Sequence, residues 1–106
     1  MKKFNLLDFL QEGPENKITS KELESITNLA GATIRAEVNR LRTAGAPIAS
    51  DANGYYIATT TEELTATIRN LQSRRNAMER AIEGLIEAKF NLAFNSSDAT
   101  RGTVND

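Results

Sequence analysis

The side chains best placed to recognise another molecule lie between residues 32 and 42, at spacings that put them on one face of a helix. Arginine can donate two parallel hydrogen bonds to guanine, asparagine can pair in the same way with adenine, and alanine or a threonine methyl can contact thymine. The alternative interpretation is an ordinary solvated helix face. We favour recognition of DNA bases by Thr33, Arg35, Ala36, Asn39 and Arg40.

The helix that would carry these side chains also has an apolar stripe. Ile34, Val38 and Leu41 repeat at intervals of four and three, which predicts one buried face. Gly45 follows the last turn as a C-terminal cap, and Pro47 prevents the helix from continuing. The polar side chains of the segment are therefore expected to face outward.

A shorter helix is predicted immediately before it. Thr19 and Glu22 have the spacing of a capping box, in which each side chain satisfies the free backbone N–H of the other. Leu23 and Ile26 are expected to face inward, and Asn28 can adopt the left-handed conformation that ends many helices. Two helices joined by a tight turn form a helix-turn-helix, which can project its second helix into the DNA major groove.

The start of the shorter helix is a second candidate contact with DNA. Free backbone N–H groups at a helix N-terminus attract phosphate. Lys17, Ser20 and Lys21 are the side chains predicted to contact the DNA backbone there. The alternative is that these residues serve only to begin the helix.

A β-hairpin is predicted after the second helix. The apolar runs 48–50 and 55–58 flank Asn53-Gly54, a pair typical of hairpins whose turn needs positive φ. Neighbouring residues on a strand face opposite sides, so either Tyr55 or Tyr56 must pack inward. Ser50, Asn53 and Tyr55 are the predicted wing contacts to DNA, although no lysine or arginine lies at the tip.

The first residues of the chain are predicted to form another helix. Phe4 and Leu7, with Leu6, Phe9 and Leu10, follow helical spacing within residues 3–12. Gly13-Pro14 is expected to end this helix and open a loop.

The longest periodic segment follows the hairpin, beginning with a second capping-box pattern at Thr60 and Glu63. Apolar residues then recur in steps of four and three, which is typical of a coiled coil. We favour dimerisation through this helix, but it could instead fold back on the head or bind another protein. In heptad terms the d positions are Leu64, Leu71, Met78 and Leu85, and the a positions are Ile68, Arg75, Ile82 and Lys89. Leucine at d with isoleucine at a favours a parallel pair. Arg75 and Lys89 at a weaken it, so antiparallel packing or a bundle stays open. The predicted dimerisation residues are Leu64, Ile68, Leu71, Arg75, Met78, Ile82 and Leu85.

These elements predict an α+β, mostly helical fold: a winged helix-turn-helix head, a two-stranded β-wing and a long C-terminal helix. The expected domains are the head at 1–59, the dimerisation helix at 60–92 and a flexible tail at 93–106. The tail is expected to be flexible because its composition turns to Asn, Ser, Thr, Gly and Asp.

Several classes of function are excluded by composition. The chain has no cysteine and no histidine, so we expect no metal site, no cofactor and no thiol or imidazole catalysis. No Gly-rich phosphate loop or paired carboxylates occur, and we predict that the protein is not an enzyme. No apolar run reaches membrane-spanning length, and Asp8 interrupts the N-terminal apolar stretch. A cytoplasmic protein, without membrane contact, is expected.

The charge balance limits how this chain can bind DNA. The formal net charge of the whole chain is −1, whereas DNA-binding domains are usually basic. Residues 17–58 carry five cations against four acids, a net charge of +1. Attraction to phosphate would be weak, so specific binding is expected to need a dimer.

Residues 22–35, the wing at 45–58 and the segment 60–71 resemble small winged-helix proteins of bacteriophages and prophages of Gram-positive bacteria. The likeness covers roughly residues 4–88, and the head is more distantly similar to the DNA-binding domain of biotin-operon repressors. Asn28 stands where the turn usually has glycine. The resemblance implies binding of double-stranded DNA, more than any particular role, in the cytoplasm of a bacterial host cell. Together with the helix-turn-helix pattern, it leads us to expect a sequence-specific transcriptional regulator.

Two functional hypotheses follow from this sequence. In the first, a homodimer places two recognition helices in successive major grooves and binds a pseudo-palindrome. In the second, the same scaffold binds a protein partner, as an accessory of phage replication or of host takeover. The near-neutral head and the long apolar helix favour the second, and the helix-turn-helix pattern favours the first.

Overall fold

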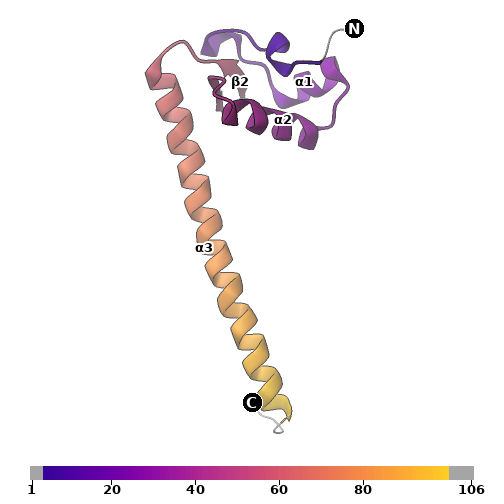
Figure 1. Cartoon of the computed structure of the whole chain (residues 1–106), viewed down its shortest axis with the longest axis vertical. Coiled ribbons are helices and arrows are strands. Elements are labelled where there is room, and N and C mark those ends of the chain that lie inside the picture. The colour runs from indigo at the N-terminus through magenta and orange to yellow at the C-terminus, as the bar shows by residue number, and fades with distance from the viewer. Residues whose placement is uncertain (1–3, 101–106) are drawn as a thin grey trace. The chain divides into compact units, whose positions relative to one another are not determined.

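A computed structural model describes residues 4–100 of the 106, with side chains described for residues 4–95. The chain divides into two units, Met1–Arg69 and Asn70–Asp106. Its elements, shown in Figure 1, are two short 3₁₀ helices, η1 (Leu6–Phe9) and η2 (Pro14–Asn16), then α1 (Ser20–Thr27), α2 (Gly31–Thr43), β1 (Ile48–Asp51), β2 (Gly54–Ile57) and α3 (Thr61–Thr100). The predicted fold class is confirmed: a winged helix-turn-helix with a long C-terminal helix.

The predicted N-terminal α-helix is wrong within the described residues. Asn5 caps only the short η1 by accepting a hydrogen bond from the Leu7 amide at 3.0 Å. The chain then becomes extended and pairs with β2, because the Ile57 amide donates to the Gln11 carbonyl at 2.8 Å and the Gly13 amide donates to the Ile57 carbonyl at 3.0 Å. The backbone groups of residues 11–13 thus bond to a strand rather than to a helix.

Helix α1 begins and ends as predicted. Thr19 accepts from the Glu22 amide at 3.0 Å, and its own amide donates to the Glu22 carboxylate at 2.9 Å. Asn28 ends the helix in the left-handed conformation, with φ 61° and ψ 29°. The capping box and the turn are both confirmed.

The inward face of α1 differs from the prediction. Leu23 is fully buried, but Ile26 is 57% exposed. Thr27 takes the inner position, one turn after Leu23, and its hydroxyl donates to the Leu23 carbonyl at 2.6 Å. The buried side of the helix passes through Leu23 and Thr27, so a residue three positions after Leu23 lies at its outer edge.

Helix α2 buries Ile34, Val38 and Leu41, as predicted. Gly45 follows its last turn with φ 100°, and its amide donates to the Arg42 carbonyl at 2.9 Å. The Ala46 amide donates to the Leu41 carbonyl at 3.0 Å. This pair of bonds is a Schellman motif, which requires the positive φ that glycine adopts without strain.

The wing is an antiparallel pair in which Asp51 lies opposite Gly54, so Ala52 and Asn53 form the turn. The sequence predicts a turn at Asn53-Gly54 with positive φ. This turn type is wrong, because among the described non-glycine residues only Asn28 has positive φ. Gly54 has φ 150°, and a Cβ atom there would lie 2.4 Å from the Ile18 carbonyl oxygen. Glycine is needed at this position because another segment lies against it.

A third segment pairs with the outer edge of β2. Ile18 and Tyr55 exchange two backbone hydrogen bonds, each of 2.9 Å. The prediction that one tyrosine packs inward is confirmed, since Tyr56 is buried and Tyr55 is half-buried. A two-stranded hairpin alone would be marginal, and this pairing ties it to the head.

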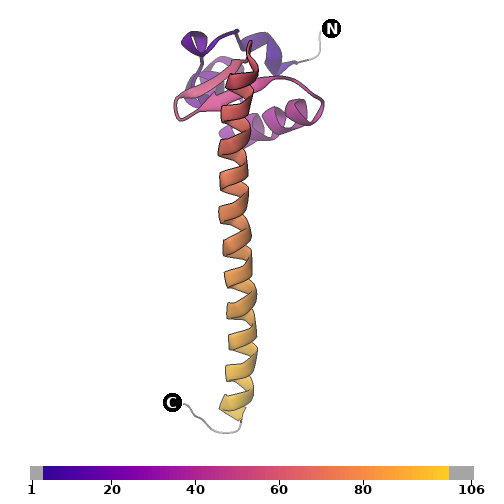
Figure 2. The ribbon, with the colours of Figure 1, turned by 90° about the vertical axis from the view of Figure 1, so that its left-hand side faces the viewer.

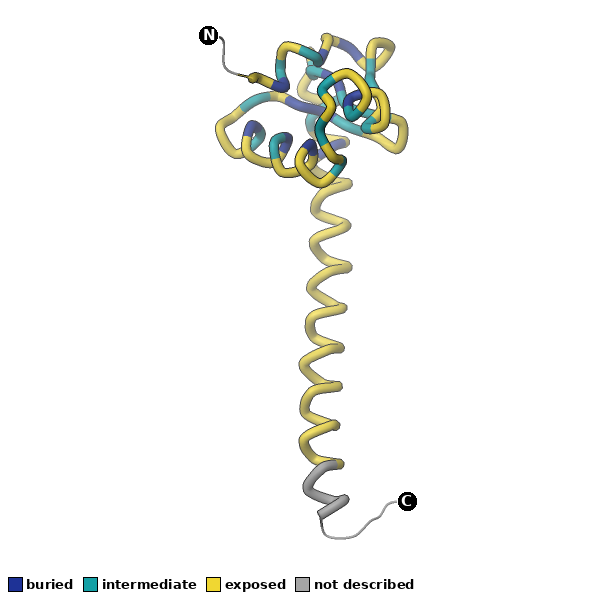
Figure 3. The backbone as a smooth tube through the Cα atoms, turned by 90° about the vertical axis from the view of Figure 1, so that its right-hand side faces the viewer, coloured by how far each residue is buried: buried dark blue, intermediate teal, exposed yellow. Residues whose placement is uncertain are grey.

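The hydrophobic core lies between the helices and the wing of the first unit. Figure 3 colours the backbone by burial, and the buried stretches lie in the first unit. Among residues 4–95, the buried ones all fall between Leu6 and Thr67. Half-buried apolar side chains, including Ile18, Leu29 and Ile57, pack around the core. Its buried members are Leu6, Leu10, Leu23, Ile34, Val38, Leu41 and Ile48.

Helix α3 runs as one continuous helix from Thr61 to Thr100 (Figure 2). Thr60 caps it by accepting from the Glu63 amide at 3.2 Å, while the Glu63 carboxylate accepts from the Thr59 amide at 2.9 Å. The sequence predicts an end at residue 92, but the helix continues for eight residues more, since each residue added to a formed helix gains a backbone hydrogen bond. The predicted flexible tail is therefore helical over 93–100, and its remainder lies outside the described residues.

Candidate nucleic-acid interface

The outward face of α2 gathers the five side chains proposed to contact DNA bases. The buried stripe of Ile34, Val38 and Leu41 fixes which side of the helix faces the core. The opposite side is exposed and is free of other elements of the head. It carries Thr33, Arg35, Ala36, Asn39 and Arg40.

The two arginines on this face are in different electrostatic states. Within residues 4–95, Arg35 has no ion-pair partner. Arg40 instead pairs with Glu37, and its Nε donates to Glu37 Oε1 at 3.1 Å. This hydrogen bond lowers the pKa of the Glu37 carboxyl and raises the pKa of Arg40. Glu37 therefore occupies two of the five N–H donors of the Arg40 guanidinium.

Lys17 is also engaged within the head. Its ammonium forms an ion pair with the Asp51 carboxylate at the end of β1. The hydrogen bond from Lys17, followed by that from the Asn53 amide at 2.8 Å, lowers the pKa of Asp51. Lys17 thus fastens the base of the wing turn to the segment before α1.

The start of α1 leaves one cation open. Lys21 is exposed and, in the part of the chain whose side chains are described, has no ion-pair partner. Ser20 is half-buried, and its hydroxyl donates to Glu24 Oε2 at 3.4 Å. Of the three residues predicted to contact phosphate, Lys21 is the one with a free charged group.

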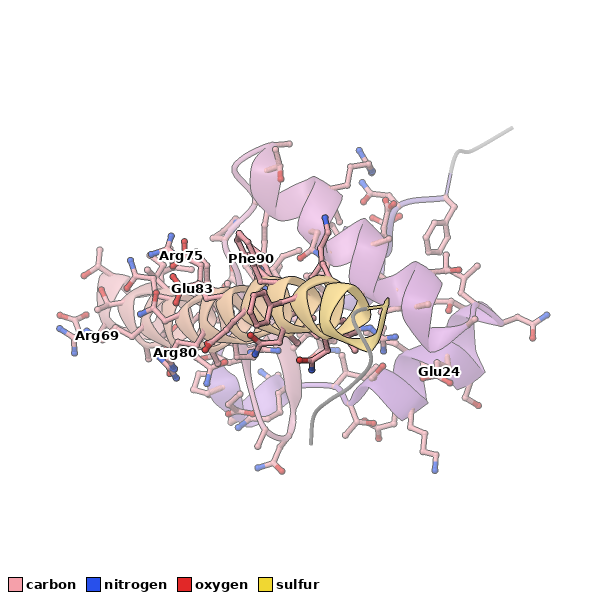
Figure 4. The ribbon with its side chains drawn as sticks, turned by 90° about the horizontal axis from the view of Figure 1, so that it is seen from below. Glu24, Arg69, Arg75, Arg80, Glu83 and Phe90 are labelled. Atoms are coloured by element: carbon pink, nitrogen blue, oxygen red, sulfur yellow. The ribbon has the colours of Figure 1, made fainter. Side chains whose placement is uncertain are left out.

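Glu24 lies at the N-terminus of α2, a position that sequence reasoning missed. A Cβ atom on Gly31, the first residue of α2, would lie 2.8 Å from Glu24 Oε2. Ala30 precedes the helix and provides no side-chain cap. The carboxylate is therefore placed where the helix dipole favours negative charge. Figure 4 shows Glu24 among the side chains of the head. The sequence feature that could have indicated this contact is Gly31, whose missing side chain leaves room for the carboxylate.

Arg42, in the last turn of α2, bonds to strand β1 of the wing. Its Nε donates to the Ile48 carbonyl at 2.9 Å, and its Nη2 donates to the Ser50 hydroxyl at 3.1 Å. Ser50 is thus occupied by the head, and half-buried Tyr55 packs on the core. Asn53, exposed in the turn, is the predicted wing contact whose side chain faces solvent.

The geometry reduces the positive charge that the head can offer to phosphate. Of the five cations in residues 17–58, Lys17, Arg40 and Arg42 bind within the head. Lys21 and Arg35 remain open. Non-specific attraction should be even weaker than the sequence predicts.

Helix α3 carries an apolar stripe that the single chain does not cover. Ile68, Leu71, Met78, Ile82 and Leu85 are exposed, from 37% at Leu71 to 70% at Leu85. Leu64 is half-buried and Arg75 is exposed. The residues predicted to dimerise are thus exposed, except for Leu64.

The described chain lacks a metal-ligand cluster and a membrane-spanning helix. Its residues contain no group of three potential metal ligands. No helix within residues 4–100 is long and apolar enough to cross a membrane.

Comparison with known proteins places the head among known families. Residues 2–56 match a family described as HTH domain, which covers just over half of the chain. The match ends within β2 and does not include α3. No curated protein and no solved structure matches the chain.

Proposed function

Because this chain belongs to the HTH domain family and so has a helix-turn-helix DNA-binding domain, we propose that it is a sequence-specific transcriptional regulator that acts as a homodimer. One observation carries the proposal. The outward face of α2 presents an open arginine and an asparagine, both exposed, both capable of bidentate base contacts, and both outside the buried stripe.

Each side chain of α2 has a proposed role. Arg35 and Asn39 contact bases, and the methyl group of Ala36 contacts thymine. Thr33 and Arg40 contact bases or phosphates. Base contacts provide specificity, and the backbone contacts below provide position.

The backbone contacts come from the start of α1 and from the wing. Lys21 donates to phosphate, helped by the free N–H groups of the helix start. Lys17 and Ser20 are secondary contacts because both already bind carboxylates of the head. Asn53 is the wing residue proposed to contact the backbone or the minor groove, with Ser50 and Tyr55 supporting the strands.

Dimerisation compensates for the low charge of one head. We assign residues 1–59 to DNA binding and the helix from residue 60 onward to pairing. Two heads on a two-fold axis bind two half-sites, so their specific contacts act together. By resemblance to small winged-helix proteins of phages and prophages, we place the regulator in that genetic setting, inside a bacterial host.

The test is selection of double-stranded DNA on the purified full-length chain, followed by titration at several salt concentrations. With about two open cations per head, the slope of log K against log salt should be about −3 to −4 for a dimer. Arg80→Ala on α3 is the control for a general loss of positive charge. Failure to enrich any sequence would remove the proposal.

A second function is favoured by the near-neutral head and the uncovered stripe of α3. In this alternative the scaffold binds a protein partner, as a phage replication or host-takeover accessory. An apolar protein interface should respond little to salt, whereas DNA binding should weaken steeply. The salt titration therefore separates the two functions.

A further inference from the structure

The exposed stripe of α3 has a feature that decides how two copies can pair. The stripe runs from Ile68 to Leu92 in steps of four and three. Its apolar side chains are at least 50% exposed, except Leu71 at 37%; they are Ile68, Leu71, Met78, Ile82, Leu85 and Leu92. Two cations, Arg75 and Lys89, stand within the same stripe. Their places in the heptad determine which side chains face each other across a dimer.

A parallel, in-register pair would bring like charges together. In that arrangement residues at a face their own copies, so Arg75 meets Arg75 and Lys89 meets Lys89 in the seam. In compensation, Arg74 would pair with Glu79 of the other copy at the rim. Exposed rim ion pairs contribute little, whereas two pairs of facing cations lie where the apolar contact should be.

An antiparallel pair centred near residue 80 removes both conflicts. Residues at a now face residues at d, so Arg75 meets Leu85 and Lys89 meets Leu71. Their aliphatic stems can cover the leucines while the charged groups reach solvent. The remaining layers are apolar: Met78 against Ile82, twice, and Ile68 against Leu92 at each end.

Charge along the helix favours the same orientation. Residues 69–80 carry four arginines and one glutamate, whereas residues 81–90 carry two glutamates and one lysine. Figure 4, which looks along α3, shows Arg75, Arg80 and Glu83 projecting from the helix. An antiparallel pair aligns the basic part of one copy with the acidic part of the other, and a parallel pair aligns like with like.

One flank of the seam also fits this arrangement, whereas on the other flank Glu79 would lie near its own copy at the exposed rim. Ala81 and Ala88 lie beside the stripe at g, and in an antiparallel pair g faces g. Ala81 would then meet its own copy close to the two-fold axis. Small side chains at this crossing allow the two backbones to approach, with the larger Met78 and Ile82 filling the seam.

From these observations we infer that two copies of α3 pair antiparallel about a two-fold axis near Arg80. The inference rests on the proposed function, in which this helix forms the dimer. Registering Met78 with Ile82 places residue 61 of one copy beside residue 99 of the other, so the starts of the two helices are ~57 Å apart. This exceeds the 34–36 Å between successive major grooves. The dimer then holds two heads apart, for separated half-sites rather than adjacent ones.

Engineered disulfides test the orientation in the full-length chain, which has no cysteine of its own. The double variant L71C/K89C should form a covalent dimer under mild oxidation, because residues 71 and 89 face each other in the antiparallel pair. L71C alone and K89C alone should stay monomeric on a non-reducing gel. Cross-linking of either single variant with itself would overturn the inference.

A distance measurement covers the case in which cysteine disturbs the seam. A spin label on E62C, an exposed position at the start of α3, should give a label-to-label distance near ~54 Å in the antiparallel dimer. A distance under about 30 Å would show a parallel pair, and a monomer by light scattering would exclude any pair. Both experiments are done without DNA. The orientation can therefore fail while DNA binding by the head stands, and the reverse also holds.

Discussion

The hydroxyl of Thr67 in α3 accepts a hydrogen bond from the Ser50 amide on the outer edge of β1, and its one proton is shared between the Ser50 and Glu63 carbonyl oxygens. The Ser50 amide donates to Thr67 Oγ1 at 3.1 Å, and Thr67 Oγ1 lies 3.3 Å from the Ser50 carbonyl oxygen. On the other edge of the sheet, the backbone N–H and C=O groups of Ile18 bond to those of Tyr55. Both edges of the wing are thus satisfied at the same level, so neither offers an open strand to another chain.

Replacing Thr67 by valine should destabilise the head. Thr67 is the buried polar residue of the described core, 5% exposed, and valine keeps its shape but removes the hydroxyl. The Ser50 amide then loses its acceptor, at a cost of about 1–3 kcal/mol. Chemical denaturation of the full-length chain measures the loss. Thr65→Val, at an exposed position of the same helix, is the matched control, and equal effects in both variants would contradict the role of the Thr67 hydroxyl.

Signals contained within a few neighbouring residues could be predicted from the sequence. Thr19 with Glu22, Asn28 and Gly45 all take the conformations expected of helix ends. Each is decided by its own side chain and the next turn of backbone. The buried stripe of α2 was equally predictable from its spacing.

Long-range pairing explains what sequence reasoning missed. Helical spacing at residues 3–12 was overridden because residues 11–13 bond to β2. The turn type was wrong because Gly54 is required by contact with Ile18, not by the hairpin itself. No local pattern contains these two long-range contacts. The state of Arg40 is a local matter, because Glu37 lies three residues before it in α2, and this spacing permits the ion pair but does not require it.

Two glycine substitutions of opposite sign test the packing at Gly54. Gly54→Ala should cost about 2–4 kcal/mol, since its Cβ atom would lie 2.4 Å from a backbone oxygen at a φ that side chains rarely adopt. Gly84→Ala in α3 meets nothing within 4 Å and should stabilise the helix by about 0.5–1 kcal/mol. Thermal melts followed by circular dichroism compare the two. A neutral Gly54→Ala would show that Ile18 does not hold its place against the wing.

The Lys17–Asp51 ion pair predicts how stability depends on pH. Asp51 has a pKa below its ordinary value of 3.8 in the folded protein, so folding favours its ionised form. This contribution is present above the unfolded value and is lost as pH falls through the lower folded value. Stability of the wild type should therefore fall more steeply below about pH 4 than that of Asp51→Asn. Melting temperatures from pH 2 to pH 7 test this, and parallel curves for both proteins would contradict it.

Arg35 is the side chain whose loss should change DNA specificity. Arg35→Ala should cost about 1–3 kcal/mol of binding and relax the preference at one base pair. Lys21→Ala is the comparison, because a phosphate contact should weaken all sequences alike and reduce the salt slope by about one. Binding of the selected DNA and of its single-base variants separates these outcomes. Arg35 is not a base contact if its removal leaves the order of preferences unchanged.

Glu37 should act as a restraint on DNA binding, because it holds Arg40 through two hydrogen bonds on the outward face of α2. Removing its charge with Glu37→Gln keeps the shape and frees the guanidinium for phosphate. Affinity at low salt should then rise for every sequence, and the salt slope should steepen by about one cation per head. If affinity instead falls, Glu37 orients Arg40 for its target rather than competing with DNA. Arg40→Ala distinguishes the two cases. If Glu37 competes with DNA for Arg40, Arg40→Ala should abolish the effect of Glu37→Gln. If Glu37 orients Arg40 for its target, Arg40→Ala should itself weaken binding.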